Sequence, residues 1–363
     1  MGNSGRSDLQ IAIRASVMPP GLAVAGIAIG RSLLRRAAAA LSVLLLAQVA
    51  VVAAELPTPV IDEWQVPWEN TRPRDPYVGP DGKVWFVGQL GHYVAVLDPQ
   101  TGEFHRIDLD PGTGPHNVIV GDDGTVWYAG NRTRHIGRID PDTGEIRKIV
   151  LRDPRAADPH TLVFDAAGDI WFTVQRGNFV GKLTVATEAV NLIPVPTPDA
   201  RPYGIIVAPD GNVWASAFGT NKLLHVHPET LTLTEIELPR EATQPRRLEA
   251  TADGRLWYVD YAEGALGFLH PPTELIIEWP TPGGDGSRPY GMAVDGANVV
   301  WFVESGLEPN RLVGFDPVSE AFTTPTAIPS GGGTVRHMHY DAASDSIWFG
   351  TDANTIGRAA LSP

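Results

Sequence analysis

The sequence predicts an all-β fold, and three observations specify which one. Tryptophans recur at near-constant intervals of 42 to 47 residues, at Trp85, Trp127, Trp171, Trp214, Trp257, Trp301 and Trp348. The repeat lacks helical periodicity, and 38 glycines and 32 prolines supply the turns that many short strands require. Asp-Gly pairs that suit tight hairpins precede several of the tryptophans. A self-similar unit of this length predicts a seven-bladed β-propeller of four-stranded blades, as one domain over residues 55–363.

Residues 1–54 do not share the repeat and predict a signal peptide. Arg31, Arg35 and Arg36 precede a short apolar run, which small residues follow. A basic region, an apolar core and a small-residue cleavage site are typical of secretory signals. An uncleaved membrane anchor is the alternative, although the run is slightly short for a span. We therefore expect a periplasmic or secreted protein that has no membrane contact after cleavage.

Each repeat resolves into four strands, and the second repeat illustrates them in order. Alternating apolar residues at 115–120 predict the innermost strand, and an Asp-Gly turn leads to a strand at 126–128 that carries the tryptophan. Residues 135–139 form the third strand, and the more polar residues 145–150 form the outermost one. A bulky ring at a fixed place in every blade suits packing between blades, so the repeated tryptophans are expected to be structural.

The two ends of the repeat region predict how the ring closes. The last repeat stops after its third strand, at 355–358, whereas an isolated outer-strand segment occurs at 61–66. Pairing of these two segments would complete the seventh blade from both ends of the repeat region. Such closure removes the exposed sheet edge that would otherwise promote aggregation.

Composition limits the classes of partner. The chain has 28 Lys and Arg against 42 Asp and Glu, a formal net charge of −14, which disfavours nucleic acid and anionic membranes as partners. It has no cysteine, which excludes thiolate metal sites and thiol catalysis. The outer strands show no obvious apolar patch, so a monomer with a small-molecule ligand is expected.

The residue that enters each innermost strand is the first place where the repeats differ informatively. It lies eleven residues before the tryptophan and is never aliphatic. Because innermost strands surround the channel, these side chains are expected at one channel mouth, where propellers commonly bind ligands. A shorter hairpin in the first blade would place Tyr77 there in place of Arg74. The predicted ring is Arg74, His116, His160, Tyr203, Arg246, Tyr290 and His337.

Carboxylates mark a further position, three residues after the tryptophan. Small or neutral residues occupy it in five blades, whereas Asp260 and Glu304 occupy it in two neighbouring blades. The hairpin returns this position to the same end of the blade, so both carboxylates are expected beside His337. His339, two residues farther along that strand, is expected to face the channel beneath His337.

The same residues have a plainer interpretation. Asp260 and Glu304 would form ordinary salt bridges with Arg246 and Arg288. The histidines at the strand entries would then cap the innermost strands around a water-filled channel.

The repeated pattern resembles one known family. Pro-His/Tyr-x-Ile, Asp-Gly-x-Val-Trp-Phe and Ile-Gly-Arg-Ile-Asp-Pro-x-Thr-Gly-Glu recur between residues 58 and 360. Together they are similar to the virginiamycin B lyase, or streptogramin lyase, family. The resemblance implies a seven-bladed propeller and a carbon–oxygen lyase that opens the ester of a cyclic depsipeptide by elimination, with assistance from Mg²⁺.

The resemblance also implies which residues act. In the last blade, His337 matches the family's general base. Val335 and Thr351 stand at the positions of the two metal-binding glutamates. Tyr290 stands where a histidine of the preceding blade would contact substrate. A match displaced by one blade places Glu304 at a metal position.

Two main hypotheses follow. The first is a lyase acting on an ester- or lactone-bearing molecule at the channel mouth, with His337, Glu304 and Tyr290 as catalytic residues and Mg²⁺ held by Glu304 and Asp260. Its expected substrate-binding residues are Arg246, Arg288, His339, His116, His160 and Tyr203. The second is a non-catalytic propeller that binds a ligand or a protein at the same mouth. A lactonase-type propeller is a third, for which the mouth offers no convincing carboxylate-Asn-Asp set.

Overall fold

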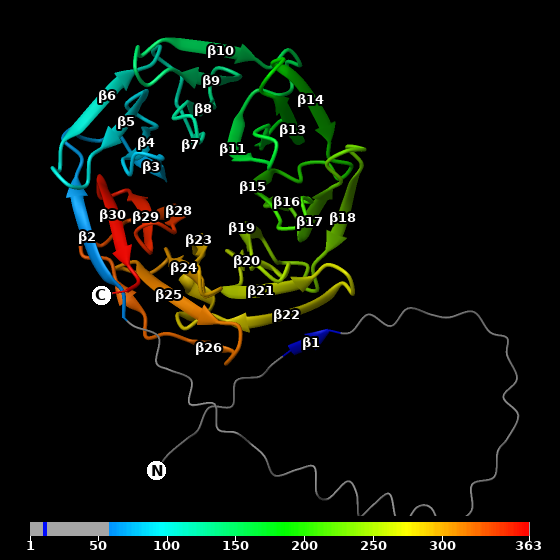
Figure 1. The fold of residues 1–363 in the computed structure, drawn as a ribbon. Helices are drawn as coiled ribbons and strands as arrows, with labels where there is room; N and C mark the ends of the chain where they lie inside the picture. Colours follow the sequence, from blue (N-terminus) through cyan, green and yellow to red (C-terminus); the bar gives the residue numbers. More distant parts are fainter. Residues whose placement is uncertain (1–9, 13–57, 363) are drawn as a thin grey trace, which may run out of the picture. The chain divides into compact units, whose positions relative to one another are not determined.

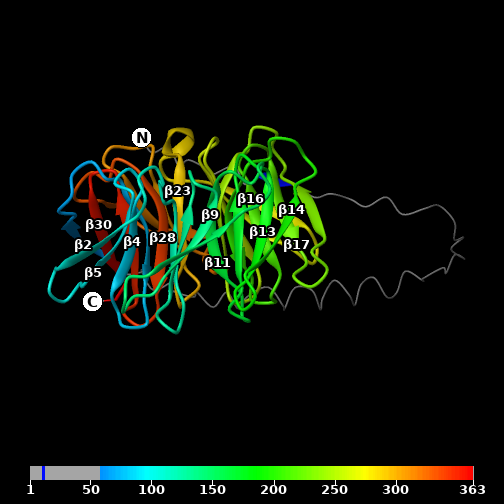
Figure 2. The same cartoon turned by 90° about the horizontal axis from the view of Figure 1, so that it is seen from above.

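The computed structural model describes residues 10–12 and 58–362. Seven antiparallel sheets stand around a central axis, which confirms the predicted all-β propeller (Figure 1). Seen from the side, the strands run between two faces that carry the connecting loops (Figure 2). The described part contains one 3-10 turn, η1 (Gly284–Ser287).

The expected signal peptide or anchor at 1–54 lies outside the described residues, apart from the short strand β1 (Gln10–Ala12). No helix within the described part is long and apolar enough to cross a lipid bilayer.

The first four blades follow one another along the chain, each from its innermost to its outermost strand. Blade 1 comprises β3 (Pro73–Val78), β4 (Val84–Gly88), β5 (Tyr93–Leu97) and β6 (Phe104–Asp108). Blade 2 comprises β7 (Val118–Val120), β8 (Val126–Gly130), β9 (His135–Ile139) and β10 (Ile146–Val150). Blade 3 comprises β11 (Pro159–Phe164), β12 (Ile170–Val174), β13 (Phe179–Thr184) and β14 (Ala189–Pro194). Blade 4 comprises β15 (Pro202–Val207), β16 (Val213–Ala217), β17 (Lys222–Val226) and β18 (Leu233–Glu237).

The remaining blades depart slightly from this scheme at their outer edges. Blade 5 comprises β19 (Pro245–Ala250), β20 (Leu256–Asp260), β21 (Ala265–His270) and β22 (Leu275–Pro280), along which β1 also pairs. Blade 6 comprises β23 (Pro289–Val294), β24 (Val300–Glu304), β25 (Arg311–Asp316) and two short outer strands, β26 (Ala321–Phe322) and β27 (Thr326–Ala327). Blade 7 comprises β28 (Val335–Asp341), β29 (Ser346–Thr351), β30 (Thr355–Ala360) and β2 (Val60–Gln65).

Blade 7 closes the ring as the sequence predicted. β2 pairs antiparallel with β30, with Asp62 opposite Arg358, whose guanidinium donates to it at 2.6 Å. The side-chain amide of Asn354 donates to the carbonyls of Val66 and Trp68, each at 3.0 Å. These contacts join residues nearly three hundred positions apart and leave β30 without an open edge.

The core of the protein lies between blades, and the repeated tryptophans build it. All seven are buried, with exposed fractions of 7 % or less. Trp127 of blade 2, for example, belongs to one apolar cluster with Leu162 and Phe172 of blade 3. Burial of such large rings dominates core energetics, which confirms that these residues are structural.

Candidate functional site

Each innermost strand presents several residues toward the channel, and the strand register identifies them. In blade 5, Pro245 pairs with Asp260, a bulge follows, and Leu248 pairs with Tyr258. We call Arg246, the residue after the proline, the entry position. The next residue is the second position, and the residue that pairs with the tryptophan is the fourth position.

This register corrects two predictions. In blade 7, Val335 takes the place of the proline, so Arg336 holds the entry position and His337 the second position. Blade 7 has one additional residue between the entry position and Trp348. A count of eleven residues back from Trp348 therefore selects His337 instead of Arg336. In blade 1, Arg74 follows Pro73 and therefore holds the entry position. Tyr77 pairs with Trp85, so it holds the fourth position and does not replace Arg74. The entry positions are Arg74, His116, His160, Tyr203, Arg246, Tyr290 and Arg336.

Arg247 crosses the channel at the level of the second position. It is only 3 % exposed, and its guanidinium donates to Thr161 Oγ1 at 3.0 Å and to the carbonyl of Arg336 at 3.1 Å. A third contact reaches Asp75 Oδ2 at 3.4 Å. These partners belong to blades 3, 7 and 1, so one side chain from blade 5 connects three other blades.

Asp75 is the buried counterion at this level. Its backbone has a φ of 48°, a left-handed conformation that costs a non-glycine residue roughly 1–2 kcal/mol. Arg74 Nε donates to it at 2.9 Å and the Asn117 amide at 3.2 Å. Burial alone would raise the pKa of Asp75, but Arg74, His337 and Arg247 together hold it well below its usual range. The carboxylate is therefore charged.

Aromatic rings surround Arg246 at the entry position. Its guanidinium carbon lies 3.7 Å from the ring centre of Tyr290, 4.2 Å from Tyr261 and 4.5 Å from Phe218. Such cation–π contacts gain strength where the cation is partly desolvated. The cage fixes the guanidinium at the mouth while Nε, buried, has no hydrogen-bond partner within the described structure.

Tyr203 and Tyr290 form a hydroxyl pair beside this cage. Their phenol oxygens are in hydrogen-bonding contact, and both side chains are buried. Burial alone would raise the pKa of Tyr203, but the guanidinium groups of Arg246, Arg74 and Arg247 outweigh it and lower the pKa to about 8. Burial and the neighbouring Tyr203 oxygen raise the pKa of Tyr290. The pair thus releases its first proton more readily than an ordinary phenol.

The histidines of the mouth are neutral. The rings of His116 and His160 are in tilted contact, with ring centres 3.5 Å apart, and the His160 ring centre lies 4.1 Å from that of Tyr203. Burial, reinforced mainly by Arg74 at His116 and by Arg247 at His160, lowers both pKa values well below the usual range. Burial and Arg247 also lower the pKa of His337 to about 3.

The mouth carries an excess of positive charge with unsatisfied donors. Four guanidinium groups stand at its entry and second positions, of Arg74, Arg246, Arg247 and Arg336, and the carboxylates that pair with them are those of Asp75 and Asp352. Buried nitrogen atoms without a hydrogen-bond partner in the described part include Arg74 Nη2, Arg246 Nε, His116 Nδ1 and His337 Nδ1. Because buried polar groups normally have partners, these atoms indicate a place for an acceptor. An oxygen-rich or anionic ligand fits this chemistry.

Asp260 and Glu304 are engaged elsewhere. Asp260 accepts from Arg240 at 3.0 Å and from three backbone amides of its own loops, including that of Gln244. Glu304 accepts from Arg311 Nε at 2.9 Å and from the Gly283 amide at 2.5 Å. Neither is among the charged groups that chiefly set the pKa of His337. The expected salt bridges exist, but their partners are Arg240 and Arg311, not Arg246 and Arg288.

These donors do not fit Mg²⁺. The family-matched positions carry Val335 and Thr351, which are apolar or neutral, and the nearby carboxylates already pair with arginines. Within the described residues, no cluster of three or more His, Asp or Glu side chains is arranged to hold a metal ion. Mg²⁺ prefers carboxylate oxygens in octahedral geometry. Mg²⁺ binding stays a prediction that this donor set does not favour, and no step below depends on it.

Two further expected residues lie away from the entry ring. Arg288 is exposed at the end of η1, with its guanidinium 5.9 Å from the Tyr261 ring centre. His339 holds a fourth position, where it stacks on Tyr77 at 4.2 Å. Sequence reasoning missed Asp75 and Arg247, although their adjacency to the polar entry residues was a usable signal.

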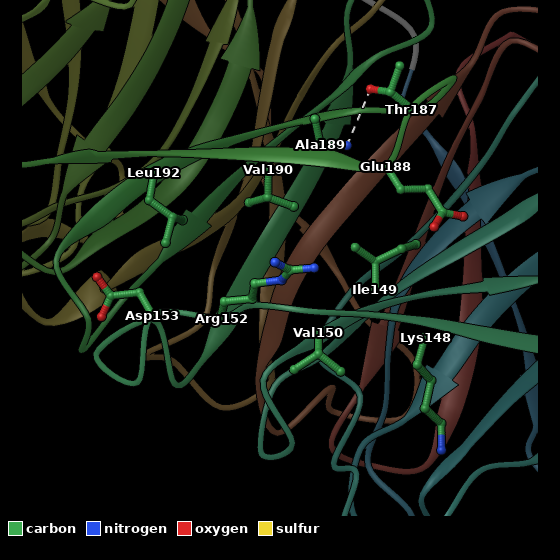
Figure 3. Close-up of a pocket in the computed structure, with 10 residues that line it drawn as sticks. All are labelled: Lys148, Ile149, Val150, Arg152, Asp153, Thr187, Glu188, Ala189, Val190 and Leu192. Atoms are coloured by element: carbon green, nitrogen blue, oxygen red, sulfur yellow. Dashed lines mark hydrogen bonds between the residues drawn. The ribbon is translucent and has the colours of Figure 1, made fainter.

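A separate cavity lies on the outside of the ring but offers less chemistry than the mouth. It occupies about 720 Å³ between β10 and β14 (Figure 3). Its charged side chains include Lys148, Glu188 and Asp153, each of which pairs with a neighbouring residue. The channel mouth, with its unsatisfied buried donors, is therefore the candidate functional site.

Comparison with known proteins agrees with this fold. Virginiamycin B lyase from Staphylococcus aureus is 24% identical over 84% of this chain and 100% of that one, with a TM-score of 0.76. A streptogramin B lyase is 23% identical over 83% of this chain and 97% of that one, with a TM-score of 0.75. The extracellular domain of a proposed hybrid two-component system from B. thetaiotaomicron is 13% identical over 85% of this chain and 43% of that one, with a TM-score of 0.64.

No curated protein matches the sequence. The model of the Virginiamycin B lyase family, however, matches residues 46–313 and 188–362, which together span nearly the whole propeller. The chain belongs to the virginiamycin B lyase family.

Proposed function

We propose that the protein is an exported carbon–oxygen lyase that opens an ester or lactone by elimination at the channel mouth. Family membership supports the reaction class. The observation that carries the proposal is the Tyr203–Tyr290 pair, which lies beside the Arg246 guanidinium and titrates below the usual range of a phenol. The basic and apolar N-terminal sequence supports export.

The reaction needs a base and a place for negative charge, and the mouth has both. The Tyr203 phenolate takes a proton from the carbon next to a carbonyl, and the electrons of that C–H bond form a C=C bond. The C–O bond of the ester breaks, and its electron pair leaves on a carboxylate. Arg246 and the free Nη2 of Arg74 stabilise the charge that develops on oxygen. No water or other reactant is consumed.

His337 is a weaker candidate for the base than the resemblance implies. Its lowered pKa of about 3 leaves it neutral but poorly basic at pH 7. Its Nδ1 is unpartnered, so it suits a hydrogen bond to substrate. In this assignment Tyr203 moves the proton, Tyr290 supports it, and the neutral histidines His116, His160 and His337 line the site.

Product mass and two matched variants test the proposal. Elimination leaves the mass of a cyclic ester unchanged, whereas hydrolysis adds one water. With cyclic depsipeptides and lactones as substrates, we expect ring opening without mass gain. Tyr203→Phe should lower kcat by about 10²-fold or more with little change in KM, and His337→Gln should lower it much less. Full activity in Tyr203→Phe, or products heavier by one water, would contradict the proposal.

A non-catalytic binding propeller is the second candidate. The observation that favours it is the fold shared with the extracellular domain of a proposed hybrid two-component system, together with the absence of a fitting metal set in the described residues. It predicts that ligands raise the thermal stability of the protein while no substrate in the panel changes mass or opens.

A further inference from the structure

A second cavity lies in the channel beyond the layer of Arg247. It has a volume of about 330 Å³ and is lined by the fourth-position residues of all seven blades, Tyr77, Ile119, Val163, Ile206, Glu249, Ala293 and His339. Because the fourth position lies near the hairpin turns of the innermost strands, this inner cavity faces the end of the channel opposite the mouth. Arg247, bonded to Thr161 and to the Arg336 carbonyl, stands between the two.

The inner cavity differs from the mouth in charge. Among the described residues that line it, Glu249 is the sole acidic side chain, and none is Lys or Arg. The wall is otherwise mostly aliphatic or aromatic. Asp122 and Asp341 line an adjoining pocket that shares Tyr77, so these two carboxylates contribute a negative potential to this end of the channel. Such a potential attracts cations and repels anions.

Glu249 has no hydrogen-bond partner in the described structure, whereas the other carboxylates of the channel, Asp75 and Asp352, pair with arginines. Burial raises the pKa of Glu249 to about 8. Arg247 is the one charged group that lowers this pKa appreciably, and its effect is smaller than that of burial. The cavity residues His337 and His339 are neutral, with pKa values lowered by burial to about 3 and about 4. An unpartnered carboxyl group among apolar side chains is an open site for a donor.

We propose that the inner cavity is a second ligand site, which binds a small apolar amine as its ammonium ion through Glu249. The ammonium group donates to the carboxylate, and the Tyr77–His339 stack offers an aromatic face to the cation. The apolar body of the ligand contacts Ile119, Val163 and Ile206 on the facing wall. This site differs from the proposed lyase site in position and in ligand charge, and it shares His337, which lies at the boundary between the two.

Binding of an ammonium ion should release a proton from Glu249. The empty site holds a neutral carboxyl group at pH 7, and the bound cation favours the carboxylate. Affinity should therefore rise with pH from 6 to about 8. The groups facing Glu249 do not reverse this trend, because His337 and His339 are already neutral in that range and Arg247 stays charged.

Titration calorimetry with benzylamine tests the proposal on the intact protein. We expect one saturable site, with proton release measured in buffers of different ionisation enthalpy. Benzyl alcohol, which has the same shape and no charge, should bind at least tenfold more weakly. Glu249→Gln, which keeps shape and removes charge, should lose at least tenfold in affinity and all of the proton release.

Two controls separate this site from the mouth. Tyr203→Phe should bind benzylamine normally, so a failure of the lyase proposal would not affect this result. Ala293→Leu, which fills the cavity and leaves Glu249 in place, should weaken binding, and circular dichroism confirms folding of each variant. Absence of saturable binding, equal binding of benzyl alcohol, or unchanged binding by Glu249→Gln would overturn the proposal.

Discussion

Arg247 and Asp75 show how a single buried pair organises the channel. Asp75 adopts a left-handed backbone, and two arginines and an asparagine hold its carboxylate. Arg247 in turn satisfies acceptors from three blades. A buried charge that loses its partner is far more costly than a surface charge, because water cannot replace the partner. The pair is therefore expected to matter for stability as well as for ligand binding.

Arg247→Met should lower the free energy of unfolding by about 3 kcal/mol, because Asp75 would then be buried with one guanidinium instead of two. Urea unfolding followed by tryptophan fluorescence measures the loss. Asp75→Asn in the Arg247→Met background should recover part of it, since the uncompensated charge disappears. Additive losses in the double variant would show that the two residues do not act as a pair.

Glu249 gives stability a pH dependence of defined sign. Its pKa is about 8 in the folded protein and roughly 4.3 when unfolded, so the folded state holds an extra proton between these values. Relative to Glu249→Gln, the wild type should therefore lose stability as pH rises from about 4.5 to about 8, by about 1–3 kcal/mol in total. Chemical denaturation at a series of pH values checks this. Exposed Glu241→Gln is the matched control, and a constant difference across the series would contradict the assignment.

At the scale of the element, β2 is the strand that converts an open row of sheets into a ring. It covers β30, and its Trp64 stacks on Trp348 with ring centres 5.4 Å apart. Without β2, one edge of blade 7 and the apolar cluster shared by blades 7 and 1 would be exposed. Closure should thus stabilise the whole ring and not only its last blade.

Trp64→Ala should destabilise the protein by about 3 kcal/mol, the usual cost of truncating a large packed ring. Val60→Ala on the same strand is the control, because Val60 is 61% exposed. Deletion of residues 55–67 should abolish the single cooperative thermal transition seen by calorimetry. A deletion variant that unfolds at the wild-type temperature would show that β2 is dispensable.

The elements also explain what the sequence could and could not predict. Strand order and closure were predictable because the tryptophan marks the same place in every repeat. The entry residues were predictable in six blades, but an additional residue before Trp348 displaced the count in the seventh. The sequence did not predict that the second position also faces the channel. Side chains of a regular strand alternate between its two faces, but the bulge after the proline interrupts this alternation. Likewise, nothing in the spacing shows that Arg240 and Arg311 take up Asp260 and Glu304.

At the scale of the whole molecule, the channel of an acidic protein has one cationic end. The chain has a net charge of −14, yet the mouth gathers guanidinium groups from blades 1, 5 and 7. The opposite end carries Asp122 and Asp341, and Glu249 adds a further negative charge when it loses its proton. Opposite potentials at the two openings would select ligands of opposite charge by electrostatic steering.

Because all seven blades contribute to the mouth, a ligand there binds the closed ring only and should stabilise all of it. Succinate at a hundredfold excess over its Kd should add about 2.7 kcal/mol and raise Tm by about 4 °C. Arg246→Met should remove this shift, and added salt should reduce it by screening. MgCl₂ at matched ionic strength should leave Tm unchanged, because Asp260 and Glu304 already bind arginines. A rise in Tm with MgCl₂ that Glu304→Gln abolishes would instead establish a metal site at the mouth.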